Sequence, residues 1–168
     1  ILAILTRDSL LGWSRDFANK VKSLRSLYGW NRILLLFIVL NLLMALLMAL
    51  APPTKFDSLT YHLLGPKLWV QDAKFTALEE NHFFAFPQQV QTLFAGQMAL
   101  RFGRLSSAAS IHWLMGTLSL MAVVGYGRRR FGLRIGLLAA VFLLASDSLW
   151  WEFSWAYNDL PPLGYAML

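Results

Sequence analysis

The chain has 168 residues, of which 57% are hydrophobic and only 14% are charged, and its mean hydropathy is +0.51. Soluble domains are about 45–50% apolar and about 25% charged, so this composition predicts an integral membrane protein. The net charge of +6 is of the kind that orients a membrane protein, and no nucleic-acid-binding motif accompanies it. The sequence contains no cysteine, which excludes disulfides, thiolate metal sites and a cysteine nucleophile.

The N-terminal half predicts one membrane span between a basic segment and a long polar loop. Residues 1–32 are basic and carry apolar residues at helical spacing, which is typical of a cytoplasmic amphipathic helix on a membrane surface. Residues 33–51 are almost entirely apolar and, at about 1.5 Å per residue, long enough to cross one bilayer core. Pro52 and Pro53 end this span. Residues 52–107 are polar and aromatic, which predicts an extracytoplasmic loop with short interfacial helices.

The C-terminal half predicts two further spans and the beginning of a third. Residues 108–126 form the second span, residues 127–134 a basic cytoplasmic turn and residues 135–151 the third span. Residues 152–159 form a short extracytoplasmic loop, and a fourth span begins within residues 160–168. The predicted fold is therefore an all-α integral membrane protein with three complete transmembrane helices, the start of a fourth, and membrane-parallel helices in a long first loop.

The distribution of Lys and Arg predicts which side of the membrane each loop faces. Cytoplasmic loops of membrane proteins carry an excess of these residues. If residues 54–107 stay on one side, most basic residues fall on the side of residues 1–32, whereas a crossing by residues 86–102 would leave the two sides nearly balanced. We therefore expect a cytoplasmic N-terminal segment, with Asp57 and Asp159 together on the extracytoplasmic side.

Asp57 and Asp159 are the strongest candidates for chemistry, because each lies just beyond a predicted span. Each also stands where a helix is expected to begin, so an N-cap role is the structural alternative for both. As a pair on one side of the membrane, the two carboxylates would suit removal of a proton from an acceptor hydroxyl or binding of a divalent cation.

Polar residues of the same loop extend this candidate site. On an α-helix Tyr61 shares a face with Asp57, whereas His62 is rotated away, so no metal pair of Asp57 and His62 is expected. Basic loop residues are candidates for holding a lipid phosphate, namely Lys55, Lys67, Arg101 and Arg104.

Two residues of the predicted spans are further candidates. His112 would suit ligation of a haem iron or a chlorophyll magnesium, or a hydrogen bond to a neighbouring helix. Asp147 lies near the outer end of the third predicted span, where an acid is costly unless it has a partner or reaches water.

Four stretches of the sequence resemble a known family of membrane enzymes. They are "FDSLTYHLLGPKLWVQ", "FAFPQQVQTLFAGQMAL", "IHWLMGTLSLMAVVGYGRRRFGLRIGLLAAVFLLASDS" and "AYNDLPPLGYAML". Together they resemble the N-terminal part of bacterial C-fold membrane glycosyltransferases, the superfamily of the protein O-mannosyltransferases and aminoarabinose transferases. The resemblance covers residues 30–168.

The resemblance implies a multi-helix membrane bundle in the bacterial inner membrane and an activity on its extracytoplasmic side. Such enzymes take a sugar from a polyprenyl-phosphate donor. An acid after the first span is their proposed catalytic base, and a second acid before the fourth span joins the site and sometimes binds a metal. Asp57 and Asp159 occupy these positions, and the Tyr-His pair of one bacterial branch matches Tyr61 and His62. Family members have more spans, so the resemblance implies that this chain is an N-terminal part.

A second hypothesis is a non-catalytic, transferase-like subunit. Three or four helices bury little among themselves, so such a chain would pack into a larger membrane complex, for example a respiratory or photosynthetic electron-transfer assembly.

Overall fold

The computed structural model describes residues 29–76, 81–100, 105 and 108–166 of a chain that divides into two units, residues 1–33 and 34–168. Of the first unit it describes residues 29–33, which include the start of the first described helix, so most of the predicted amphipathic segment lies outside the described residues. Every regular element among the described residues is a helix, and none is a strand. The predicted all-α class is confirmed.

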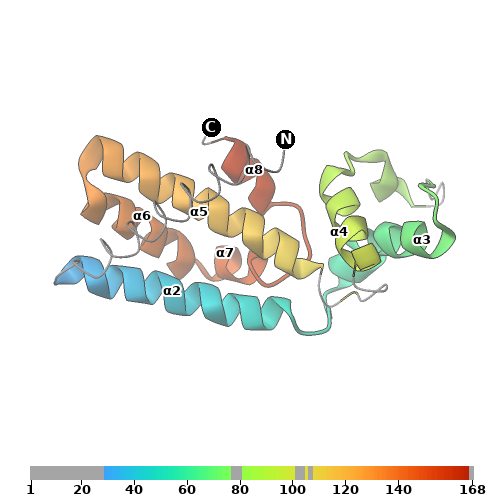
Figure 1. Ribbon diagram of the computed structural model, residues 1–168, viewed down its shortest axis with the longest axis horizontal. Helices are drawn as coiled ribbons and strands as arrows, with labels where there is room; N and C mark the ends of the chain where they lie inside the picture. Colours follow the sequence, from blue (N-terminus) through green and yellow to red (C-terminus); the bar gives the residue numbers. More distant parts are fainter. Residues whose placement is uncertain (1–28, 77–80, 101–104, 106–107, 167–168) are drawn as a thin grey trace, which may run out of the picture. The chain divides into compact units, whose positions relative to one another are not determined.

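The second unit combines long helices with several short ones (Figure 1). After α2 (Trp30–Ala49), the region predicted as the first loop contains the π-helix η1 (Ser58–His62), α3 (Leu64–Asp72), the 3₁₀-helix η2 (His82–Ala85) and α4 (Gln89–Leu100). The remaining helices are α5 (Ala109–Phe131), α6 (Leu133–Ala145), α7 (Asp147–Glu152) and α8 (Leu160–Tyr165).

Two of the described helices, α2 and α5, are long and apolar enough to cross a membrane. The third predicted span, residues 135–151, is not one continuous helix. It is divided at Ser146, whose backbone is extended, into the short apolar helix α6 and the separate helix α7. Asp147 is exposed in the first turn of α7, where an acid is favoured by the helix dipole.

The basic run predicted as a turn is helical up to Phe131. Arg128, Arg129 and Arg130 lie in the last turn of α5, where positive charge is favoured by the carbonyl end of the helix. The chain reverses at Gly132, which has φ of +95°, a value that residues with a side chain rarely adopt. The turn between α5 and α6 is therefore much tighter than the predicted turn of residues 127–134.

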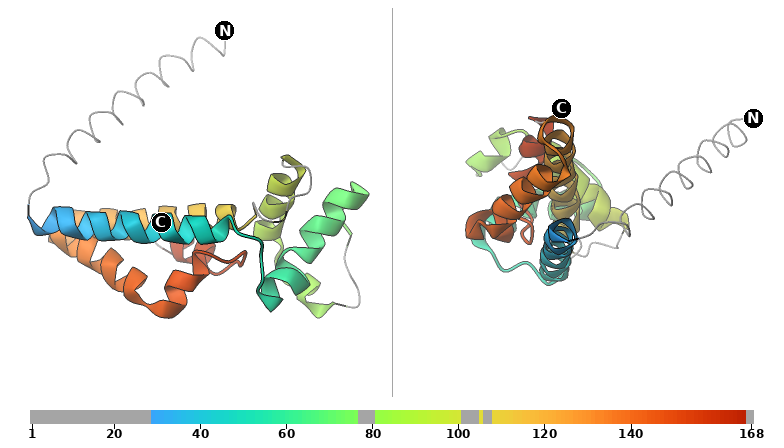
Figure 2. Two further views of the ribbon diagram at one scale, coloured as in Figure 1. Left: turned by 90° about the horizontal axis from the view of Figure 1, so that it is seen from below. Right: turned by 90° about the vertical axis from the view of Figure 1, so that its left-hand side faces the viewer.

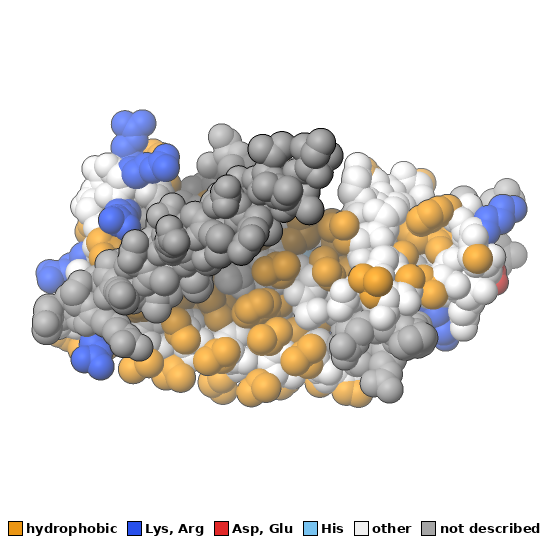
Figure 3. All heavy atoms as spheres, in the orientation of Figure 1, with side chains coloured by type: hydrophobic (Ala, Val, Ile, Leu, Met, Phe, Trp, Pro, Cys, Tyr) orange, Lys and Arg blue, Asp and Glu red, His pale blue; other side chains and the backbone are white. Residues whose placement is uncertain are grey.

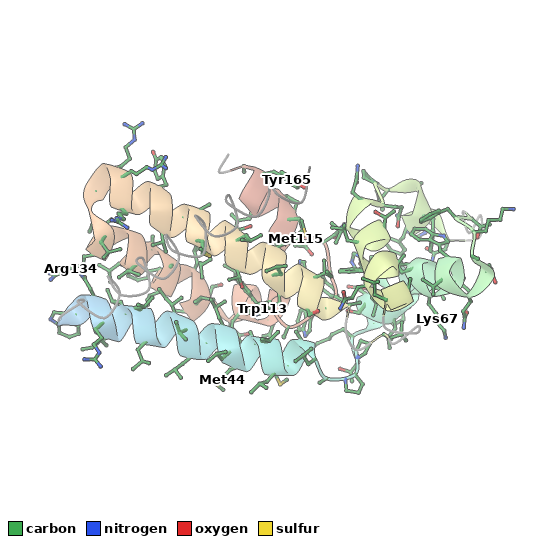
Figure 4. The ribbon with its side chains drawn as sticks, viewed as in Figure 1. Met44, Lys67, Trp113, Met115, Arg134 and Tyr165 are labelled. Carbon is green, nitrogen blue, oxygen red and sulfur yellow. The ribbon has the colours of Figure 1, made fainter. Side chains whose placement is uncertain are left out.

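The core of the second unit lies where α2, α5 and α6 run side by side (Figures 1 and 2). Ile38 and Ala45 of α2 meet Leu120 of α5 and Leu137 of α6 in one buried cluster. Trp113 lies between α5 and α2, and its indole N–H donates to the backbone carbonyl of Leu42 at 2.9 Å (Figure 4). This contact satisfies a polar atom of a large aromatic residue inside an apolar interface.

Two glycines let α5 and α6 approach to backbone contact. A Cβ built on Gly136 would lie 2.5 Å from the carbonyl oxygen of Val124, and one built on Gly127 would lie 2.5 Å from the Cα of Gly136. Both obstacles are backbone atoms, which cannot rotate away as a side chain can.

We expect Gly136→Ala to lower the free energy of unfolding by about 2 kcal/mol, because the added methyl group forces the two helices apart. Gly125→Ala is the matched control in α5, since its Cβ would meet nothing within 4 Å. That control should gain up to about 1 kcal/mol from the better helix propensity of alanine. Denaturant unfolding in detergent measures both, and equal effects of the two changes would contradict the close helix contact.

A second buried cluster joins the predicted loop region to the start of α5. Leu63, Phe94 and Met98 pack against Ala108 and Ala109. A Cβ on Gly65 would lie 2.4 Å from the ring of Phe84, so η2 and its neighbours also lie directly against α3. This packing places η1 and the segment before α4 opposite the segment between α7 and α8.

Candidate functional site

Asp57 and Asp159 line the same cleft, which has a volume of about 350 Å³ and which we call the acidic cleft. Its walls come from three segments far apart in the sequence. The segment of η1 contributes Asp57, Tyr61 and His62. The segment around the start of α4 contributes Phe83, Phe86, Gln88 and Gln91, and the segment before α8 contributes Tyr157, Asn158 and Asp159.

Neither acid caps the helix that follows it. Asp57 precedes η1 and Asp159 precedes α8, but neither side chain makes a capping hydrogen bond. Instead, the charge of Asp57 adds to burial in raising the pKa of Tyr157, and the charge of Asp159 adds to burial in raising the pKa of Glu152. The capping alternative drawn from the sequence is therefore wrong for both residues.

The π-helical turn of η1 brings His62 into the cleft together with Tyr61. The sequence argument assumed α-helical geometry, in which His62 would be rotated away from Asp57. A π-helix closes its hydrogen bonds over five residues instead of four, so the residue five positions after Asp57 stays on its side. The expected rotation of His62 away from Asp57 is wrong, since both line one cleft, and turns of this kind are frequent at functional sites.

His62 is buried and neutral in the cleft wall. Its Nδ1 lies 3.0 Å from Nε2 of Gln91, an amide N–H donor, so the ring proton sits on Nε2. Burial lowers the pKa of His62 to about 4, although Asp159 and Asp57 act in the opposite direction. Gln91 itself is 3% exposed, and its Oε1 is buried with no hydrogen-bond partner among the described residues.

Aromatic rings form the rest of the cleft. Tyr61 stacks on Phe83 with ring centroids 4.1 Å apart and planes 14° apart, and His62 lies 5.2 Å from the ring of Tyr157. Burial, followed by the charge of Asp57, raises the pKa of Tyr61 and raises that of Tyr157 to about 12. Both tyrosines are therefore hydroxyl donors at neutral pH, and no Lys or Arg among the described residues lines the cleft.

Glu152 is a third acid, which does not line the acidic cleft but is influenced by the charge of Asp159, and the sequence analysis did not single it out. It is the last residue of α7 and is partly buried. Burial, then the charge and hydrogen bond of Asp159, raise its pKa to about 7. In the sequence Glu152 stands inside an aromatic run, and its position after a predicted span was the one signal that could have marked it.

His112 fixes the segment that carries Glu152, Tyr157 and Asp159. It is fully buried, and its Nδ1 lies 3.0 Å from the backbone carbonyl oxygen of Glu152 and 2.9 Å from that of Trp155. Carbonyl oxygens only accept, so Nδ1 carries the proton, while Nε2 accepts the backbone N–H of Leu160 at 3.1 Å. Both ring nitrogens are engaged with backbone, which leaves none for haem iron or chlorophyll magnesium. Of the two roles that the sequence suggests for His112, metal ligation and a hydrogen bond to a neighbouring helix, the hydrogen-bonding role is confirmed.

A second cleft, of about 380 Å³, lies at the end of α2 and is called here the lysine cleft. Its walls are largely apolar and include Met48, Ala49, Trp151 and Trp155. Among the described residues that line it, Lys55 carries the single charge, and its Nζ lies 4.3 Å from the ring centroid of Trp155. The segments that form the lysine cleft, residues 51–58 and 151–156, run directly into those that carry Asp57 and Asp159.

The other basic candidates are not part of either cleft as described. Lys67 is exposed on α3 (Figure 4), and it lines neither the acidic nor the lysine cleft. Arg101 and Arg104 lie outside the described residues. Within the described part of the chain, no group of three or more His, Asp or Glu side chains is arranged to hold a metal ion.

No family model, curated protein or solved structure matches the chain.

Proposed function

We propose that this chain belongs to a membrane glycosyltransferase that takes a sugar from a polyprenyl-phosphate donor on the extracytoplasmic side, and that it supplies the enzyme's N-terminal part. The observation that carries the proposal is the convergence of Asp57 and Asp159, neither engaged as a helix cap, in a cleft beside an apolar one that holds Lys55. The sequence resemblance places the same two acids in the site of that superfamily.

The acidic cleft suits an acceptor that donates hydrogen bonds. The carboxylate of Asp57 lines the cleft together with Tyr157, and a carboxylate in this place can take a proton from an acceptor hydroxyl. The buried Oε1 of Gln91, which lacks a partner within the described residues, offers a further acceptor for a ligand hydroxyl. Stacked aromatic rings of Tyr61 and Phe83 supply an apolar surface for a sugar ring.

The lysine cleft suits a lipid-linked phosphate. A phosphate group needs a cation, which Lys55 provides, and a polyprenyl chain needs an apolar surface, which the end of α2 and the Trp151 and Trp155 rings provide. Two of the three segments that line the acidic cleft also contribute to the lysine cleft. A donor phosphate at Lys55 would therefore leave the sugar on the side of Asp57.

Membrane insertion is part of the proposal and is supported by the exposed surface of α2. Only 17% of its most apolar stretch is buried, whereas the core helix of a soluble protein is mostly buried. Large apolar side chains such as Leu43, Met44 and Leu47 are about half exposed or more. Figure 3 shows hydrophobic side chains along the lower edge of the view, where α2 lies. Lipid contact would cover them.

The proposal is tested by donor kinetics of the full-length protein that contains this chain. With a labelled polyprenyl-phosphate sugar as donor, we expect transfer to an acceptor and a KM for the donor that rises about 10-fold in Lys55→Met, since a hydrogen bond to a charged group contributes about 1.5–3 kcal/mol. Lys67→Met, which removes an exposed lysine outside both clefts, is the control and should leave KM unchanged.

Two results would count against this function. Equal changes of KM in Lys55→Met and Lys67→Met would refute the claim that the lysine cleft binds the donor phosphate. Absence of transfer with every lipid-linked sugar, together with co-purification of the chain in fixed ratio with a larger membrane complex, would support the non-catalytic subunit instead.

A further inference from the structure

Among the described residues that line the acidic cleft, Gln91 alone has a buried polar atom without a hydrogen-bond partner. That atom is Oε1, and the residue as a whole is 3% exposed. The other glutamine of the wall, Gln88, donates its amide N–H groups to the backbone carbonyls of Phe83 and Phe86. Buried side-chain polar groups are nearly always hydrogen-bonded, because loss of water without a new partner costs free energy. The Oε1 of Gln91 is therefore suited to a donor carried by a ligand of the cleft.

His62 holds the amide of Gln91 in one orientation. The Nδ1 of His62 lies 3.0 Å from the Nε2 of Gln91, and His62 is itself buried, with 4% of its surface exposed. The amide nitrogen donates and never accepts, so Nδ1 is the unprotonated, accepting nitrogen of the ring. A half-turn of the amide would bring two acceptors, Oε1 and Nδ1, face to face. The contact therefore keeps Oε1 on the side of the amide that is turned away from His62.

Core packing fixes the position of this pair. Gln91, Phe94 and Met98 follow one another at helical spacing on the buried face of α4, so the glutamine occupies a position where the helix places core side chains. His62 precedes Leu63, which packs in the same cluster as Phe94 and Met98. An apolar side chain at position 91 would be buried without the cost of removing an amide from water. Stability alone therefore does not account for the glutamine.

The groups that line the acidic cleft define the chemistry of its ligand. Asp57 and Asp159 contribute carboxylate oxygens and Gln91 an amide oxygen, and no Lys or Arg of the described residues is present there. Such a set of acceptors matches a ligand that carries several hydroxyl groups. The volume of about 350 Å³ lies at the lower end of the range for small-molecule sites, about 300–1,000 Å³. The stacked rings of Tyr61 and Phe83 add an apolar surface for a sugar ring.

We propose that Gln91 is a specificity-determining residue: its Oε1 accepts a hydrogen bond from one ring hydroxyl of the transferred sugar, and His62 is the positioning residue that keeps this oxygen directed at the ligand. The site then selects a sugar with a free hydroxyl at that ring position and discriminates against the deoxy analogue, which leaves the buried oxygen unpaired. The selection of a sugar rests on the proposed transferase function, whereas the pairing of His62 with Gln91 does not.

The selection is tested with the full-length protein and a panel of polyprenyl-phosphate sugars that each lack one ring hydroxyl. We expect the wild-type protein to prefer the parent sugar over one of these analogues by about 10- to 100-fold in kcat/KM. Gln91→Met keeps the length of the side chain and removes the acceptor, so it should reduce this ratio to about 1 for that analogue alone. Gln89→Met, at an exposed position of the same helix outside both clefts, should keep the wild-type ratio. The ratio compares two substrates on one enzyme, so partial unfolding of a variant does not alter it.

The same panel tests the role of His62. His62→Phe removes the acceptor for the amide N–H of Gln91, so the ratio for the same analogue should fall toward that of Gln91→Met. Equal ratios in the wild type and Gln91→Met would show that water, and not the sugar, meets Oε1, and would overturn the proposal. An equal loss of preference for every analogue of the panel would show general damage to the cleft and would overturn it as well. A wild-type ratio in His62→Phe would refute the positioning role.

Nitrogen NMR of the full-length protein with labelled histidine tests the pair without any sugar. At neutral pH we expect a neutral His62 with its proton on Nε2, identified by the loss of its signals in His62→Phe. Gln91→Met should shift the resonance of the unprotonated Nδ1, and Gln89→Met should not. A proton on Nδ1 would turn the amide round, place its N–H in the cleft and overturn the proposal. The expected tautomer without any sugar transfer would refute the transferase function and the selection of a sugar, and leave the pair of His62 and Gln91 intact.

Discussion

Replacing Asp57 by Asn is expected to slow sugar transfer by at least about 100-fold, because a positioned general base contributes about 10²–10⁴-fold to such a reaction. The amide of Asn keeps the size of the side chain and cannot take a proton from the acceptor hydroxyl. Since no atom is added to or removed from the wall of the cleft, the cleft should keep its shape. Rates measured with saturating donor and acceptor would place the loss in kcat.

Asp72→Asn provides the matched control for this experiment. Asp72 is the last residue of α3, is exposed, and lies outside both clefts, so the same chemical change there should leave kcat within a factor of about two. Circular dichroism of both variants checks that the helices are intact. Unchanged transfer by Asp57→Asn would refute the assignment of Asp57 as the base.

The two principal acids could be found from the sequence because each one follows a hydrophobic segment. A Lys and Arg count then put both on one side, and the structure brings Asp57 and Asp159 to one cleft. What the sequence could not supply is the surroundings of these acids. Asp57 and Asp159 stand at cap positions without capping, and the neighbours whose pKa they raise, Tyr157 and Glu152, are determined by tertiary packing.

Errors in the sequence analysis came from assuming regular α-geometry. His62 was placed away from Asp57 because α-helical spacing was applied to a π-helical turn, which no residue pattern in "SLTYH" announces. The third span was drawn through Ser146 and Asp147 because hydropathy averages over a window, whereas these two residues favour a new helix start. Hydropathy thus detected the apolar segments but not the break between α6 and α7.

Glu152 and Gln91 were missed for a different reason. A glutamate beside an aromatic run and a glutamine in a polar loop are ordinary surface residues in a sequence, and their chemistry comes from partial or complete burial. Burial raises the pKa of Glu152 and leaves the Oε1 of Gln91 without a partner among the described residues. Such effects depend on which segments pack together, and that packing depends in turn on His112.

Replacing His112 by Phe is expected to lower the free energy of unfolding by about 4 kcal/mol, the largest stability loss among the changes considered. Phenylalanine keeps a planar aromatic ring but removes both ring nitrogens. The buried backbone N–H of Leu160 then loses its acceptor, and the carbonyls of Glu152 and Trp155 lose a donor. Each buried polar group left without a partner costs about 1–3 kcal/mol. Thermal or denaturant unfolding in detergent measures the loss.

His82→Phe is the control, because His82 is exposed and packs against Phe83 through a ring contact that phenylalanine can keep. That change should alter stability by less than about 0.5 kcal/mol. His112 holds the segment that carries Glu152, Tyr157 and Asp159, so His112→Phe should also slow sugar transfer. Equal stability of the two variants would show that the segment between α7 and α8 is held by other contacts.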